Sequence, residues 1–447
     1  MSKYVDRPRF GCAMAGALGV LRAIPRAIPI IHASTGCGYN VYNGTNAGSA
    51  YLGGGYCGAT STPSSNIIEK EIVFGGEDRL EEQIKTTLEI MDGDLYVVVT
   101  GCMVEMVGDD AESVVKEFAG SENPPVIAVP TPSFKGNSYY GYDLLLEGLV
   151  KQYIVPKEKK EVRTVNILGI LPGQDVLWKG NLKEIKRVLQ LIGIKANTLF
   201  GEGETLQDIQ HSAVASLNII VSDVYGSLTA EAYKEIHEIP FIRTALPVGY
   251  LQTEKFLREI GGYFKIAESV IEKALESERD IYFDYVERIA DIYNDVDFQR
   301  YSIVVSDANY APSVSEFLSD ELGWLPQLTV ITDFLTEQQK QKLERRFEAY
   351  ASGLKPTVRF DTDTSSVRRY LKDTWELDSN QRYYDSLGPS VILGSVFEKD
   401  LSDEFKYPLI TISFPVTNRV IMNRAYVGFN GGITLIEDIF TTLVAGR

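Results

Sequence analysis

The sequence predicts an α/β protein built from three Rossmann-like domains, each a parallel sheet flanked by helices. Short β-branched runs alternate along the chain with amphipathic stretches, which is typical of βα units and parallel sheets. The 447 residues exceed the roughly 100–200 residues of one compact domain. The pattern also restarts twice, after a polar break at residues 156–161 and again at Tyr301. We therefore expect domains near residues 1–155, 156–300 and 301–447, the last with a C-terminal helix.

The expected first domain contains three strands, at residues 28–31, Leu95–Thr100 and 125–130. Its expected helices are residues 77–91, where apolar side chains recur at helical spacing, 111–118 and 142–153. In the other two domains the expected strands are residues 164–171, Leu217–Val221, Phe241–Thr244, 301–306, 328–331, Thr357–Phe360, 391–394 and 409–413. The expected helices there are residues 182–192, 254–293 and 431–444.

Composition excludes several functional classes. The chain has 44 Lys and Arg against 61 Asp and Glu, a net charge of −17, and we find no basic stripe. Because affinity for nucleic acid requires cationic side chains that neutralise phosphates, we expect no nucleic-acid partner. The longest apolar stretches are about half of the roughly 20 residues that a membrane span needs, so we expect no membrane partner. The polar N-terminus has no apolar signal region, which favours a cytoplasmic protein.

The four cysteines are few but clustered. Cys12, Cys37, Cys57 and Cys102 all fall in the first quarter of the chain. Four cysteines cannot form a disulfide scaffold in a chain of this length, and a reducing cytoplasm favours thiolate ligation or redox chemistry. The distribution therefore indicates one local site in the first domain.

The cysteines follow the expected strands. Ligands bind parallel sheets beyond the carboxyl ends of the strands, where the loops converge. Cys37 comes after residues 28–31, Cys102 follows Leu95–Thr100, and Ser133 follows the third strand. Cys12 lies in a Gly-rich entry to the same domain, and Gly11, Gly16, Gly36, Gly38 and Gly101 would allow the backbone to approach a bulky inorganic ligand. We expect three sulfurs and the Ser133 hydroxyl to meet at this edge.

Spacing separates the alternatives for these thiols. The cysteines are separated by 24 and 64 intervening residues. A zinc ribbon uses tight Cys pairs and does not fit this spacing. Dispersed thiolates suit an iron–sulfur cluster, which needs only spatial convergence. Position alone also allows the cysteines to be small buried hydrophobic residues.

Several motifs resemble one known family, the component 1 proteins of nitrogenase and their nitrogenase-like relatives. The triad Cys12, Cys37 and Cys102 resembles that family's cluster cysteines. Residues 71–80 (Glu-Ile-Val-Phe-Gly-Gly-Glu-Asp-Arg-Leu) resemble its Val-Phe-Gly-Gly segment, and residues 101–110 resemble its Cys-x₄₋₅-Gly-Asp-Asp motif. Residues 131–136 resemble the β-subunit Thr-Pro-Ser-Phe-x-Gly. Segments near residues 166, 180, 412 and 428 extend the similarity over nearly the whole chain.

The resemblance implies a role in electron transfer. In the family, each subunit type contributes half of the ligands of the P-cluster, and an ATP-dependent Fe protein supplies electrons. It implies that Cys12, Cys37 and Cys102 bind half of a P-cluster-type cluster, 8Fe-7S or 4Fe-4S, shared with an α-like subunit in an α2β2 assembly. It also implies that Ser133 lies beside the cluster and can ligate it when oxidised.

Two absences from the sequence indicate the subunit type. The family's α subunit holds its catalytic cofactor with a cysteine in the second domain and a histidine in the third. This chain has no cysteine after Cys102 and no histidine after His237. The resemblance therefore implies a β-type subunit, an oxidoreductase component without catalytic residues of its own. Residues 33–39 and 53–58 depart from the usual β-subunit sequence, which leaves the substrate open.

Other candidates are weaker. Cys57 has no counterpart in the family and could be a further ligand or a free thiol. His32 could donate to a cluster sulfide or serve as a structural hydrogen-bonding residue. Asp109 and Asp110 could cap the helix that follows or lie near a docking surface. We expect surface or packing roles for two histidines and two tyrosine pairs: His211, His237, Tyr139 with Tyr140, and Tyr383 with Tyr384. No P-loop motif is present, so we expect no ATP site of that kind.

Alternative functions also remain. The chain could belong to a nitrogenase-like reductase of methylthio-alkanes or tetrapyrroles. It could instead be a scaffold on which a cofactor precursor is assembled. From the sheet pattern alone, it could be a nucleotide-sugar transferase without any cluster.

Overall fold

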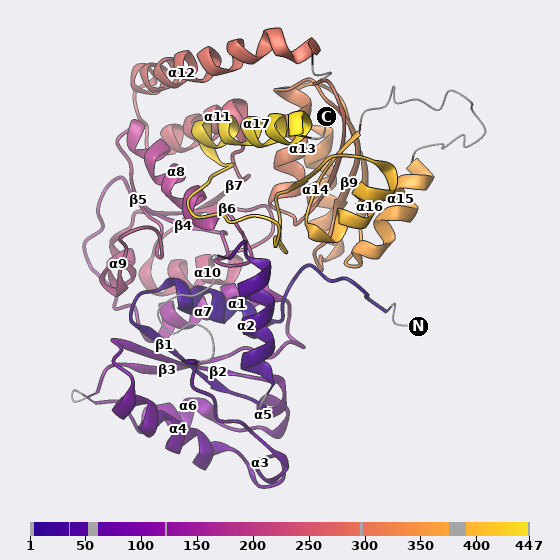
Figure 1. Cartoon of the computed structure of the whole chain (residues 1–447). Coiled ribbons are helices and arrows are strands. Elements are labelled where there is room, and N and C mark those ends of the chain that lie inside the picture. The colour runs from indigo at the N-terminus through magenta and orange to yellow at the C-terminus, as the bar shows by residue number, and fades with distance from the viewer. Residues whose placement is uncertain are drawn as a thin grey trace.

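The computed structural model describes residues 4–34, 36–51, 61–120, 123–295, 298–374 and 390–445. In this part of the chain the strands form three sheets, of three, four and five strands, and every strand pair is parallel. Helices flank the sheets, with the N-terminal part at the bottom of Figure 1 and the other two parts above it. The predicted fold class is therefore confirmed.

The N-terminal sheet has the order β1 (Ala27–His32), β2 (Leu95–Thr100), β3 (Val126–Pro130). Because helices cover both faces, β1 and β2 are buried along their whole length. Ile28, Ile30 and Tyr96 pack on one face against α4 (Glu77–Ile90) and α6 (Ala111–Lys116). The other face packs against α1 (Ala13–Ala23) and α7 (Ser138–Gln152).

The middle sheet has the order β5 (Lys195–Asn197), β4 (Thr164–Leu168), β6 (Leu217–Val221), β7 (Phe241–Thr244). Its helices are α8 (Trp178–Leu191), α9 (Leu206–His211), α10 (Ser227–His237), α11 (Gly249–Tyr263) and α12 (Glu268–Asp295). The single helical stretch expected over residues 254–293 is thus two helices. The chain breaks at Lys265, which has a positive φ of 50° and ends α11 after two glycines.

The C-terminal sheet has the order β10 (Thr357–Phe360), β9 (Leu325–Ile331), β8 (Tyr301–Ser306), β11 (Ser390–Gly394), β12 (Leu409–Thr411). Its helices are α13 (Tyr310–Asp320), α14 (Glu337–Glu348), α15 (Val367–Thr374) and α16 (Lys399–Phe405). The last helix, α17 (Gly428–Ala445), leaves this sheet and packs on α8, α11 and α12. The end of the chain therefore completes the middle layer of the molecule.

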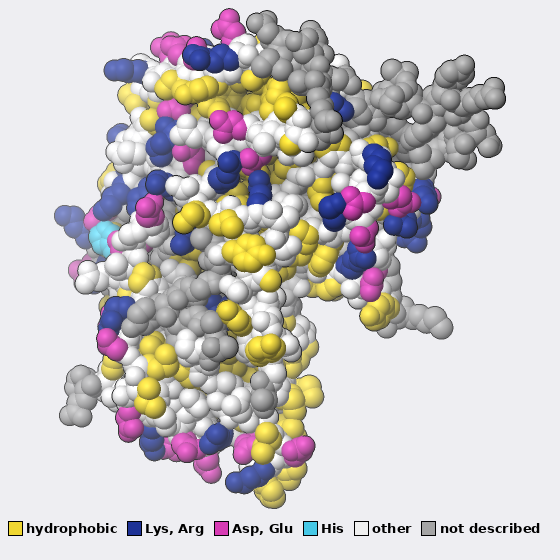
Figure 2. All heavy atoms as spheres, in the orientation of Figure 1, with side chains coloured by type: hydrophobic (Ala, Val, Ile, Leu, Met, Phe, Trp, Pro, Cys, Tyr) yellow, Lys and Arg dark blue, Asp and Glu magenta, His cyan; other side chains and the backbone are white. Residues whose placement is uncertain are grey.

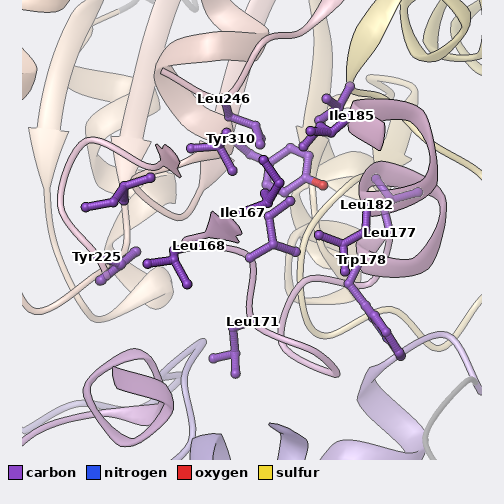
Figure 3. Packing of buried hydrophobic residues seen from close by; sticks show 14 of the residues in the cluster. Ile167, Leu168, Leu171, Leu177, Trp178, Leu182, Ile185, Tyr225, Leu246 and Tyr310 are labelled. Atoms are coloured by element: carbon purple, nitrogen blue, oxygen red, sulfur yellow. The ribbon is translucent and has the colours of Figure 1, made fainter. Parts of the chain in front are cut away.

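One continuous apolar core joins the three parts. Figure 3 shows Ile167 and Leu168 of β4, Leu182 and Ile185 of α8, and Tyr310 of α13 packed together, all of them buried. Leu171, which lies beyond the end of β4, is nearer to the N-terminal part. The domain boundaries remain predictions, because the core does not stop at them. Among the described residues, no helix is long and apolar enough to cross a membrane.

Buried carboxyl groups lie in this junction, and they predict how stability depends on pH. Burial raises the pKa of Asp175 to about 7, although the Leu177 N–H and the Tyr310 hydroxyl act in the opposite direction. Burial also raises the pKa of Asp333, and nearby Asp307 adds to this effect. The folded protein therefore keeps protons that the unfolded chain releases above pH 4.

We expect the free energy of unfolding to fall as the pH rises from about 4 to about 7. Over this range the unfolded chain has already lost the Asp175 proton, whereas the folded protein still binds it and must give it up. The contribution of this one group is up to about 4 kcal/mol. Asp175→Asn keeps the oxygen that accepts from Leu177 and Tyr310 but cannot titrate, so it should flatten the dependence. Urea denaturation at pH 5 and pH 8 measures the slope, with the exposed Glu158→Gln as control. An equal slope in the two variants would contradict the assignment.

Candidate functional site

Three cysteines lie at helix starts beside the N-terminal sheet. Cys12 is the N-cap of α1, α2 (Cys37–Gly48) begins at Cys37, and α5 (Cys102–Val107) begins at Cys102. Cys37 and Cys102 follow the carboxyl ends of β1 and β2, as the sequence pattern predicts. The first turn of α1 presents the backbone N–H groups of Met14 and Ala15 to the Cys12 sulfur, which favours negative charge there.

Cys102 and Ser133 are in direct contact. The Cys102 Sγ atom lies 2.8 Å from the Ser133 Oγ atom and accepts the Ser133 backbone N–H at 3.1 Å. Thr131 holds this loop in place, because its hydroxyl donates to the carbonyl of Thr100 at the end of β2 at 2.9 Å. Two adjacent parallel strands thus deliver a thiol and a hydroxyl to one point.

Cys12 and Cys37 complete the group. Burial raises the pKa of the Cys12 thiol, the backbone N–H of Ala15 acts in the opposite direction, and the charges of Cys37 and Cys102 raise it further. The Cys12 thiol therefore lies in the same region of the molecule as Cys37 and Cys102. The Ser34 hydroxyl lies 3.4 Å from the Cys37 sulfur. All three cysteines are free thiols and half-buried, while Ser133 is exposed, so the group opens to the molecular surface.

The chemistry of the donor set, three thiols and a hydroxyl, fits the ligands of an iron–sulfur cluster. Within the described ranges, no three His, Cys, Asp or Glu side chains form a site for one ion. Thiolates with an adjacent hydroxyl are ligands for a larger iron–sulfur group, whose remaining positions a second protein surface can complete. Cys12, Cys37, Cys102 and Ser133 would be the ligands from this chain, and that role remains a prediction.

His32 is a structural residue and does not face a cluster. It is fully buried at the end of β1, where Nε2 lies 3.1 Å from the Asp109 carboxylate and Nδ1 lies 3.0 Å from the Ser65 hydroxyl. Because a carboxylate only accepts, Nε2 carries the proton and Nδ1 accepts from Ser65. Burial lowers the pKa of His32, with Asp109 acting in the opposite direction. Both ring nitrogens are used, so none remains for a sulfide.

The acidic pair has two separate structural functions. Asp109 also accepts the Gly76 N–H at 3.0 Å, and the Asp110 N–H donates to Glu77 at 2.8 Å. The two motifs that resemble the family therefore bind each other. The Asp110 carboxylate accepts the Ser113 N–H at 2.9 Å, which confirms the predicted cap of α6.

The remaining candidates have packing or surface positions where the structure describes them. His211 is half-buried and lies 3.3 Å from Glu161, and His237 is buried against Tyr233. Tyr139 stacks on Tyr225 with ring centroids 3.8 Å apart. Cys57, Tyr383 and Tyr384 lie outside the described residues.

The sequence predicts that glycines near the cysteines let the backbone approach a ligand, but three of them face protein atoms instead. A Cβ atom on Gly16 would lie 1.7 Å from the Ser138 carbonyl oxygen, and one on Gly11 or Gly101 would lie 2.6 Å from an alanine Cβ. These three glycines permit close packing within the protein. The expectation that they make room for a ligand is wrong for them, because protein atoms occupy that space.

Sequence reasoning missed an exposed apolar patch beside the cysteines. It consists of Val73 and Phe74, at the end of α3 (Glu69–Phe74), and Met106 of α5, with 72%, 82% and 76% of their surfaces exposed. The two helices lie in contact, and Figure 2 shows hydrophobic side chains gathered over this region at the lower right. The apolar run Ile72 to Phe74 within a polar segment was the available signal. We call these three residues the α3–α5 patch.

Fold and site together define a class of protein: a three-sheet α/β subunit that presents cysteines at one sheet edge. The chain belongs to the nitrogenase component 1 type oxidoreductase family, whose model matches residues 12–444. Within that family it is a β-type subunit and thus a component of an oxidoreductase.

The relatives cover nearly the whole chain. It is 24% identical to the nitrogenase molybdenum-iron protein beta chain of Methanococcus maripaludis, over 98% of this chain and 94% of the relative. The iron-iron beta chain of Rhodobacter capsulatus is 25% identical with the same coverage, and the vanadium-iron beta chain of Trichormus variabilis is 26% identical over 99% and 94%. A solved structure described as nitrogenase Cp1 at pH 6.5 has a TM-score of 0.78 at 20% identity, over 100% of this chain and 95% of that one, and shows the same fold.

Proposed function

We propose that this chain is the β-type subunit of a nitrogenase or nitrogenase-like reductase and holds half of a P-cluster-type iron–sulfur cluster. The observation that carries the proposal is the group of free thiols, with Cys102 in contact with Ser133, at one edge of the N-terminal sheet. The similarity to beta chains over the full length supports it.

The residues of this chain would bind and tune the cluster, while the reaction takes place on the partner. When bound, the cluster supplies one-electron transfer between a reductase and an α-like subunit. Cys12, Cys37 and Cys102 would hold the cluster through their sulfurs, and the backbone N–H of Ala15 in α1 favours negative charge on Cys12. Ser133 keeps a hydroxyl beside Cys102, where it can donate to the sulfur or replace a ligand upon losing its proton.

The proposed function implies two partners. The half-buried thiols need a second protein surface to complete their ligand set, which an α-like subunit would supply in an α2β2 assembly. The α3–α5 patch would bind the ATP-dependent Fe protein. Helix α5 supports this placement, because it carries Cys102 at one end and exposed Met106 near the other. An electron donor bound there would lie one short helix from the thiols.

The substrate of the assembly depends on the partner. Beta chains named for molybdenum-iron, iron-iron and vanadium-iron nitrogenases match this chain about equally well, so the similarity does not favour one metal. Residues 33–39 and 53–58 depart from β-subunit sequence, which favours a second candidate, a nitrogenase-like reductase of methylthio-alkanes or tetrapyrroles. Turnover assays of the whole assembly with dinitrogen and with these compounds distinguish the two.

The cluster can be tested directly. The chain, purified without oxygen together with its α-like partner, should contain iron and sulfide and give an iron–sulfur Mössbauer spectrum. We expect Cys12→Ala, Cys37→Ala and Cys102→Ala each to remove most of the signal, and Cys57→Ala to retain it. The proposal would be contradicted by a wild-type complex without an iron–sulfur signal, or by a signal that persists in all three single variants. A colourless but functional complex would favour the transferase or another cluster-free function.

A further inference from the structure

The segment that precedes Cys12 is held by the C-terminal part of the molecule. Figure 1 shows this segment running from α1 to the edge of the C-terminal part. The Arg7 carbonyl accepts from the Thr364 hydroxyl at 3.0 Å, and the Arg7 side chain donates to the Phe397 carbonyl at 3.3 Å and to Asp400 at 3.2 Å. We call residues 6–11 the strap. It connects two parts of the protein that are more than 350 positions apart in sequence.

Arg9 is the buried anchor of the strap. Only 3% of its surface is exposed. One terminal nitrogen donates to Ser413 at 2.9 Å and to the carbonyl of Val305, the other forms an ion pair with buried Glu398. Glu398 in turn accepts the N–H of Ser395 at 2.8 Å. The planar guanidinium reaches all of these acceptors at once, which an ammonium group on a lysine cannot do.

The anchor is linked to Cys12 by a chain of hydrogen bonds. The Arg9 carbonyl accepts from the Gln174 side-chain Nε2 at 2.5 Å, and the Gln174 side-chain Oε1 accepts from the Ser138 hydroxyl at 3.1 Å. The Ser138 N–H closes the chain by donating to the Gly11 carbonyl at 2.9 Å. Hydrogen bonds therefore fix the carbonyl groups at both ends of the segment 9–11, immediately before Cys12.

We propose that Arg9 is a positioning residue for Cys12. The ion pair of Arg9 with Glu398 and its hydrogen bonds to Val305 and Ser413 hold the strap, and the strap fixes where the Cys12 sulfur lies. The consequence for the cluster rests on the proposed function, because it requires Cys12 to be a ligand. The effect on Cys12 itself does not require a cluster. The C-terminal part of the chain thus controls one ligand of a site in the N-terminal part.

The first test measures thiol accessibility in the full-length chain prepared without iron. Each cysteine is alkylated with iodoacetamide under native conditions, and the rates are read by mass spectrometry of the peptides. We expect Arg9→Met to accelerate alkylation of Cys12 about tenfold through local opening, with the rate at Cys102 unchanged. Arg26→Met is the matched control, because exposed Arg26 in the same part also binds two carboxylates, Asp92 and Asp94.

A double variant separates positioning from loss of folding. Arg9→Met alone leaves the Glu398 charge buried and unpaired, which destabilises the protein. Arg9→Met with Glu398→Met removes both charges and should recover thermal stability, yet Cys12 should still react fast because the bonds to Val305 and Ser413 are missing. Arg9→Lys should give an intermediate rate. Equal acceleration at all three thiols, or no change at Cys12, would overturn the inference.

The second test uses the complex with its partner. We expect Arg9→Met to shift the midpoint potential and the electron paramagnetic resonance signal of the cluster, and Arg26→Met to leave both unchanged. If the wild-type complex contains no cluster but Cys12 responds as described, the proposed function fails and the inference about Cys12 stands. If the cluster is present and neither the signal nor the alkylation rate responds to Arg9, the inference fails alone.

Discussion

Replacing Gly141 by alanine should lower the free energy of unfolding by about 3 kcal/mol or more, the largest effect that we expect from adding one methyl group. Helices α1 and α7 cross at two glycines. A Cβ atom on Gly141 would lie 1.7 Å from the Ala13 carbonyl oxygen, and one on Gly16 would lie 1.7 Å from the Ser138 carbonyl oxygen. Both obstacles are backbone atoms, so the helices themselves must separate. Gly16→Ala should have a similar effect.

Gly141→Ala should also displace one of the cysteines. Ala13 follows Cys12 directly, and Ser138 donates to the Gly11 carbonyl. Separation of the two helices therefore displaces the Cys12 sulfur as well as loosening the core. Urea denaturation measures the stability, and iron content of the purified complex measures the site. We expect a loss in both.

Gly262→Ala is the matched control for these two variants. Gly262 lies in α11, and a Cβ atom there would meet nothing within 4 Å. Because alanine favours a helix over glycine, this change should stabilise the protein by about 0.5–1 kcal/mol. If Gly141→Ala had the same free energy of unfolding as Gly262→Ala, the inference that α1 and α7 are in backbone contact at Gly141 would be wrong.

The sheets could be predicted from the sequence because their signal is local. Strands β7 and β10 match the predicted bounds residue for residue, and β2 does as well. Strand β2 is buried along its whole length, and its apolar β-branched run can be recognised without knowing its partner. Strands β7 and β10 are half-buried edge strands, and their short β-branched and aromatic runs are a local signal of the same kind. The order of the strands and their registers depend on long-range packing, and no local pattern contains that information.

Helix α1 could not be predicted in the same way. Its sequence contains Gly16 and Gly19, and a glycine costs up to about 1 kcal/mol in a helix. The helix forms because these glycines allow α7 and the loop at Pro172 to pack closely against it. Tertiary contacts thus override the local preference, and from the sequence alone Gly16 is assigned to a ligand instead.

The site was partly predictable for the same physical reason. Strand ends could be located, so the neighbourhood of Cys37, Cys102 and Ser133 followed from the rule for parallel sheets. The position of Cys12 depends instead on Arg9 and Glu398, which lie 389 positions apart. His32 was also ambiguous, because its carboxylate partner, Asp109, lies 77 positions away. Pairings at such separations leave no pattern in a single sequence.

Replacing Phe74 by aspartate should uncouple the assembly from its reductase. Phe74 is the most exposed residue of the α3–α5 patch, and an aromatic anchor at the centre of an interface typically contributes about 2 kcal/mol or more. We therefore expect the affinity for the Fe protein to fall about thirtyfold, and reductase-driven turnover to fall with it at subsaturating concentrations. Iron content and reduction of the cluster by a small-molecule reductant should not change, since Phe74 is not among the predicted ligands.

A control variant and two other outcomes would show which partner the α3–α5 patch binds. Ile90→Asp is the control, because Ile90 is a similarly exposed apolar residue. It ends α4, just before β2 begins, whereas Cys102 follows the other end of β2. This variant should leave binding of the reductase unchanged. If Phe74→Asp prevented association with the α-like subunit, the patch would belong to that interface. If it changed neither association nor reductase-driven turnover, the placement of the Fe protein on α3 and α5 would be wrong, because a buried aspartate at an interface cannot be neutral without a partner for its charge.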